Sequence, residues 1–106
     1  MAKYLIHASY TADGLKGLQR DKASGRQQAV RQVLESVGGR LESMYYALGD
    51  DDVVIIADLP DNVAVSAVSL GVSATGFVRT RTTALLTIEE TDRALAASIN
   101  YRKPGG

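Results

Sequence analysis

The stretch RLESMYYALGDDDVVIIADLPD, residues 40–61, decides the fold. Two runs rich in aromatic and β-branched residues, 40–48 and 53–59, flank a short segment of glycine and aspartate. The residues of the two runs favour strands, and Gly and Asp favour the tight turn between antiparallel strands. Pro60 ends the second run, because proline has no amide hydrogen for a strand ladder. We therefore predict a central β-hairpin with Asp50 and Asp51 at its tip.

A strand and a helix are expected on each side of this hairpin. Residues 3–10 alternate in the manner of a strand, residues 11–23 suggest a weak helical turn and a loop, and Ser24 begins a helix that ends at Gly38. After the hairpin, the pattern predicts a helix over 63–75 that is capped by Asp61 or Asn62, and a strand over 77–87. A capping box of Thr87 and Glu90 then opens a third helix that runs to about Ala97.

The order β-α-β-β-α-β predicts a ferredoxin-like α+β fold. Right-handed crossovers place both long helices on one face of a four-stranded antiparallel sheet and leave the other face open. We expect residues 1–97 to form this single domain and residues 98–106 to form a flexible tail.

Composition excludes several classes of protein. The chain has 106 residues, with 12 Lys and Arg against 12 Asp and Glu, so nothing in bulk indicates a nucleic-acid partner. It has no cysteine, which excludes disulfides and thiolate chemistry. No apolar run matches a signal peptide or a membrane span, and we expect a cytoplasmic location with no membrane contact.

The open face of the predicted sheet is too apolar to remain in water. With a two-residue loop, Tyr45 lies opposite Ile56 and Ser43 opposite Asp58. The open face then carries Leu5, Tyr45, Val54 and Ile56. An apolar patch of this kind favours a second copy, so we expect a face-to-face homodimer or higher oligomer with a ligand pocket between the sheets.

Three segments resemble the GYD domain family: YLIHASYT, GGRLESMYYALGDDDVVIIADLPDN and GFVRTRTTALLT. The resemblance covers roughly residues 3 to 92, and the family signature falls on Gly49, Asp51 and Asp52. Asp51 stands where the family usually has tyrosine. The resemblance implies a protomer of the dimeric α/β-barrel superfamily, and it implies no assigned activity and no cofactor.

The candidate site residues come from the open face. His7 is the candidate general base, with Tyr45 or Asp58 orienting it, and the candidate ligand-binding residues are His7, Ser9, Tyr45, Arg79 and Arg81. Each has a structural alternative: His7 and Tyr45 as interface residues, and the arginines as solvated edge residues. Three hypotheses follow: a metabolite-binding oligomer, a cofactor-free monooxygenase or isomerase, and a non-catalytic assembly or regulatory module.

The aspartate triplet has two interpretations, a turn or a metal site. A calcium loop needs further alternating oxygen ligands, whereas this triplet leads directly into a strand, so we favour the turn and expect no metal. In the turn, Asp50 and Asp51 lie in water. Asp52 begins the next strand, and we expect its carboxylate to accept hydrogen bonds from backbone amides of the turn or of a neighbouring chain.

Overall fold

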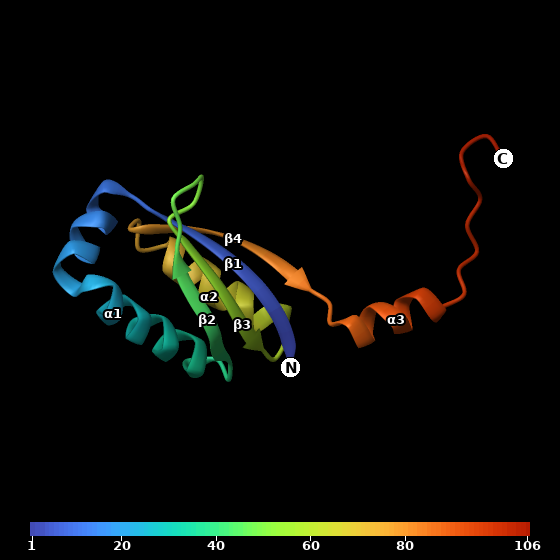
Figure 1. Cartoon of the computed structure of the whole chain (residues 1–106), viewed down its shortest axis with the longest axis horizontal. Coiled ribbons are helices and arrows are strands. Elements are labelled where there is room, and N and C mark those ends of the chain that lie inside the picture. The colour runs from blue at the N-terminus through green and yellow to red at the C-terminus, as the bar shows by residue number, and fades with distance from the viewer.

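The computed structural model describes all 106 residues as one four-stranded sheet with three helices. In chain order the elements are β1 (Ala2–Tyr10), α1 (Ala12–Ser36), β2 (Arg40–Tyr46), β3 (Val53–Leu59), α2 (Asn62–Ser73), β4 (Val78–Leu85) and α3 (Ile88–Ala96). The strands pair antiparallel in the order β2-β3-β1-β4. In Figure 1, α2 lies behind the strands and α1 runs along the β2 side of the sheet. The predicted ferredoxin-like α+β fold is confirmed.

The core lies between the sheet and the two long helices. Ten buried hydrophobic residues form it: Tyr4, Ile6, Ala8, Leu34, Leu41, Val53, Ile55, Ala57, Leu59 and Val65. On β1 and β3 these are alternate residues, as expected for strands with one face covered. The predicted assignment of side chains to the two faces is therefore correct. No helix has the length and apolar character that crossing a membrane requires.

The hairpin between β2 and β3 has a longer loop than predicted. Tyr45 lies opposite Val54 rather than Ile56. The Ala47 amide donates to the Asp52 carbonyl at 2.8 Å, which leaves residues 48–51 as the loop. The predicted register was therefore wrong by two residues. Because side chains alternate with a period of two, this even shift leaves every residue on its predicted face.

A β-bulge in β2 changes the register again. The pairing shifts between Leu41 and Ser43, and beyond the bulge Arg40 lies opposite Asp58. The prediction had placed Ser43 opposite Asp58, which is wrong. The bulge instead brings an arginine beside that carboxylate.

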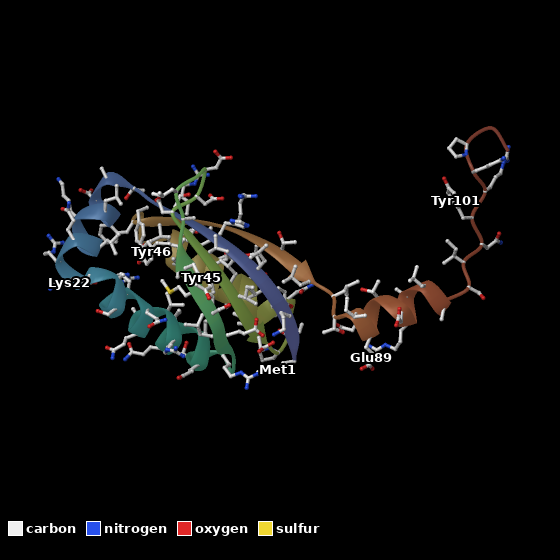
Figure 2. All side chains as sticks on the ribbon, in the orientation of Figure 1. Met1, Lys22, Tyr45, Tyr46, Glu89 and Tyr101 are labelled. Atoms are coloured by element: carbon white, nitrogen blue, oxygen red, sulfur yellow. The ribbon has the colours of Figure 1, made fainter.

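Helix α1 begins much earlier than predicted. Thr11 caps it by accepting a hydrogen bond from the Gly14 amide, and the chain departs from helical geometry at Lys22, whose φ is 64°. Figure 2 shows Lys22 at the outer bend of α1. The segment before Lys22 is therefore a helix rather than the predicted weak helical turn and loop, whereas the segment after Lys22 agrees with the helix predicted from Ser24. Gly14 lowers helix propensity, but a Cβ there would lie 2.1 Å from the Phe77 carbonyl oxygen, so only glycine fits this contact.

The remaining helices have the predicted caps. Asp61 caps α2 by accepting from the Ala64 amide. Thr87 and Glu90 form the predicted capping box of α3. In contrast to the other helices, α3 extends away from the sheet, and Glu89 and Tyr101 lie far from the strands in Figure 2.

Candidate functional site

Four side chains, one from each strand, form a row across the open face of the sheet. Tyr45 of β2 lies opposite Val54 of β3. Val54 in turn lies opposite His7 of β1, and His7 lies opposite Arg81 of β4. Antiparallel pairing therefore brings the histidine and an arginine into direct neighbourhood.

Asp51 reaches back from the hairpin loop onto the β1–β4 end of this row. Its Oδ1 accepts a hydrogen bond from Ser9 Oγ at 2.9 Å, and its Oδ2 accepts one from the Arg81 guanidinium. The same Oδ2 lies 3.4 Å from His7 Nδ1. We call His7, Ser9, Asp51 and Arg81 the loop cluster. Only 17% of the Asp51 side chain is exposed, whereas 67% of the Arg81 side chain is exposed.

These contacts hold Asp51 in its charged form. The hydrogen bond from the Arg81 guanidinium is the main cause, and the hydrogen bond from Ser9 adds to it, so that the pKa of Asp51 lies below its usual value. Partial removal from water acts in the opposite direction and does not overcome them. The carboxylate is therefore a fixed negative charge at neutral pH.

The position of Asp51 corrects the prediction that this side chain lies in water. The prediction assumed a two-residue loop with both residues at its tip. The four-residue loop instead curls toward β1, which lets the last loop residue reach the open face. Asp50 is exposed at the loop, as predicted.

Asp52 accepts a backbone hydrogen bond, as predicted, but from a donor other than the predicted ones. Its Oδ2 accepts a hydrogen bond from the Tyr10 amide at 2.9 Å, and its own amide donates to the Ala8 carbonyl at 2.9 Å. The donor belongs to β1 rather than to the turn. Asp52 therefore fastens the end of the hairpin to the central strand, and this connection positions the adjacent Asp51.

Asp58 belongs to a different cluster. It lies opposite Lys3, four residues from the His7 pairing, which corresponds to about 13 Å along the strand. Its carboxylate lies 2.8 Å from Lys3 Nζ and 3.1 Å from Arg40 Nη2, and only 9% of its side chain is exposed. The hydrogen bond from Lys3 is the main reason that the pKa of Asp58 is lowered. We call Lys3, Arg40 and Asp58 the strand cluster. The proposed orientation of His7 by Asp58 does not occur.

Tyr45 and Arg79 lie on the open face at the margins of the loop cluster. Tyr45 is 70% exposed. Strand β3 lies between Tyr45 and His7, so their backbones are two strand spacings, or roughly 10 Å, apart. Arg79 lies opposite Ser9 and is exposed. Figure 2 shows Tyr45 and its neighbour Tyr46 on β2. Tyr46 lies on the helix side but is 39% exposed rather than a core residue.

Sequence reasoning missed the central member of the loop cluster. The sequence predicts Asp51 only as a turn residue, although its place in the family signature is a signal that it does more. Among the described side chains, no group of three or more histidines and carboxylates could hold a metal ion. The loop cluster offers an imidazole beside a charged carboxylate that is bound by Arg81, and Arg79 lies at its margin.

The family model of the GYD domain matches residues 4–95. Because this match covers most of the chain, the chain belongs to the GYD domain family, and the observed ferredoxin-like protomer agrees with that. The comparisons with curated proteins and with solved structures found no match.

Proposed function

We propose that this GYD domain protein forms a homodimer through the open faces of its sheets and binds a small anionic metabolite between them. The observation that carries the proposal is the loop cluster, in which three polar side chains converge on the single carboxylate of Asp51. Ordered polar groups on an otherwise apolar surface are typical of small-molecule sites.

The dimer follows from the apolar residues beside the loop cluster. Leu5, Val54 and Ile56 are half-buried in the isolated protomer, and Tyr45 is 70% exposed. A second sheet would remove these side chains from water and would close the loop cluster into a pocket. A stable interface buries about 800 Å² on each partner.

Charge determines the class of ligand. Arg79 and Arg81 lie on one edge strand, and Asp51 neutralises only one of them. The surplus positive charge favours a carboxylate or a phosphate, which arginine can bind with two parallel hydrogen bonds.

Sedimentation equilibrium at micromolar concentration tests the dimer. We expect Val54→Arg to produce a monomer and Val63→Arg, a matched change at an exposed position of α2, to leave the dimer intact. A wild-type chain that sediments as a stable monomer would contradict the proposal.

A thermal-shift screen with small carboxylates and phosphates tests the ligand class. We expect a hit to disappear in the double variant Arg79→Ala/Arg81→Ala and to persist in Arg93→Ala, which removes an exposed arginine on α3. Equal shifts in all three proteins would place the binding elsewhere.

A second candidate function, proton abstraction from the bound metabolite, is favoured by the contact between His7 and Asp51. A carboxylate beside Nδ1 favours the tautomer with its proton on that nitrogen, which leaves Nε2 free to accept one. On any substrate identified by the screen, His7→Ala should lower kcat much more than it changes ligand affinity. Unchanged turnover would leave binding as the only role.

A further inference from the structure

The helix side of the sheet contains a hollow that the proposed function does not use. It has a volume of about 140 Å³ and lies between α1, α2 and the strands, and 13 of its 15 lining residues are hydrophobic. Its floor includes Ile6 and Val53 from the sheet, and its walls include Val33 from α1 and Val72 from α2. We call it the helix-side chamber.

The helix-side chamber has a polar mouth. A second hollow of about 350 Å³ shares four of its lining residues, Tyr10, Arg26, Val72 and Val78. This outer hollow is bounded by charged side chains, among them Asp21 of α1. The two hollows together form an apolar interior with a charged entrance, and Arg26 lies at the junction.

Arg26 lacks the partners that a guanidinium in such a place requires. Its Nε is buried and has no hydrogen-bond acceptor. Its one ion pair joins Nη1 to Asp21 Oδ2 at 3.5 Å, longer than a charge-assisted hydrogen bond of about 2.7–2.9 Å. A buried donor without an acceptor destabilises the protein, so an incoming acceptor would gain that free energy.

Two tyrosine hydroxyls add polar groups near this arginine. Tyr10, which lines both hollows, places its hydroxyl 3.1 Å from that of Tyr46. Because Tyr10 and Arg26 both line the two hollows, this hydroxyl pair and the guanidinium border the same space. A carboxylate bound at the junction could therefore accept hydrogen bonds from the guanidinium and from a tyrosine hydroxyl.

We propose that the helix-side chamber binds a free amphipathic monocarboxylate, with its hydrocarbon part among the valines and its carboxylate on Arg26. Apolar cavities of about 150 Å³ accommodate a benzene-sized group, so the hydrocarbon part is a ring or a chain of about six to eight carbons. This site lies on the opposite side of the sheet from the loop cluster, and the proposal stands independently of the function proposed there.

Calorimetric titration with octanoate and with octan-1-ol tests the role of Arg26. We expect Arg26→Leu to weaken octanoate binding at least about tenfold, as the loss of a charged hydrogen bond predicts, and to leave octan-1-ol binding unchanged. Arg31→Leu is the matched control, because it removes the same charge from an exposed position on the same helix. Asp21→Asn should tighten octanoate binding, since it removes the carboxylate that competes for Arg26.

Ala29→Leu tests the chamber itself, because Ala29 lines it and a larger side chain would fill it. We expect this variant to lose both probes while its circular dichroism melt shows that it is folded. Three results would overturn the proposal: no octanoate binding by the wild type at millimolar concentration, equal binding by Arg26→Leu, or loss of octanoate binding in Arg79→Ala/Arg81→Ala. The last result would place the carboxylate on the open face and would support the function proposed there.

Discussion

The open face holds two aspartates that both pair with cations, but the elements that hold them in place differ. Asp58 lies within β3, between cations that come from the neighbouring strands β1 and β2. Asp51 lies on a loop and reaches partners on β1 and β4. The register of the sheet fixes every member of the strand cluster, whereas the loop cluster depends on one hairpin. We infer that the strand cluster serves stability and the loop cluster serves binding.

Asp58→Ala should have the largest effect on stability. Its side chain is 9% exposed, and its removal leaves Arg40 without its carboxylate partner and leaves Lys3 with Glu42 alone. We expect the free energy of unfolding to fall by about 2–3 kcal/mol, less than for a fully buried pair because Arg40 is largely exposed. Urea denaturation monitored by circular dichroism measures it. A decrease of less than about 0.5 kcal/mol in the free energy of unfolding would mean that the strand cluster contributes no more than ordinary surface residues do.

Asp52→Ala should destabilise the protein by about 1–2 kcal/mol, because the half-buried Tyr10 amide loses its acceptor. Asp50→Ala is the control from the same triplet, and we expect it to lie within about 0.5 kcal/mol of the wild type. The same urea experiment compares the two. Equal effects would show that the triplet acts only through its total charge.

Acid should remove the contribution of the strand cluster. The pKa of Asp58 is lowered in the folded protein, so its stabilisation is present above the unfolded value of about 3.9 and is lost as the pH falls through the folded value. Asp58→Asn should therefore differ from the wild type at pH 6 and approach it as the pH is lowered below about 4. Urea midpoints at successive pH values test this, and a gap that stays constant would exclude a charge effect.

Much of this comparison could be predicted from the sequence, and the part that could not has a physical reason. Alternation along β1 and the hairpin placed His7, Ser9 and Tyr45 on the correct face, because an even error in register does not exchange the faces. To predict which residues lie opposite each other, however, the exact register of the strands must be known. A bulge and two extra loop residues were enough to replace Ser43 by Arg40 opposite Asp58.

Contacts between residues that are distant in sequence also explain why the sequence did not predict the first half of α1 or the helix-side chamber. The first half of α1 has glycines that lower helix propensity, and the contact between Gly14 and Phe77 that favours the helix is distant in sequence. The helix-side chamber depends on how far α1 and α2 lie apart on the sheet, which no periodicity encodes. Arg26 therefore gave no signal in the sequence.

Asp51→Asn should have the smallest effect on stability and the clearest effect on binding. Its partner Arg81 is 67% exposed, and exposed ion pairs contribute about 0–1 kcal/mol, so the free energy of unfolding should change little. The substitution removes the negative charge that occupies Arg81 and thereby frees the guanidinium for an external anion. Inorganic phosphate should consequently raise the melting temperature of Asp51→Asn more than that of the wild type, and Arg81→Ala should abolish the difference. At the other end of the face, Asp58→Asn releases Arg40 while Lys3 stays paired with Glu42, so we expect a smaller phosphate response than in Asp51→Asn, where Arg81 and Arg79 lie on one strand. If phosphate stabilised both asparagine variants equally, the two clusters would not differ in the way proposed, and the loop cluster would lose its claim to be a binding site.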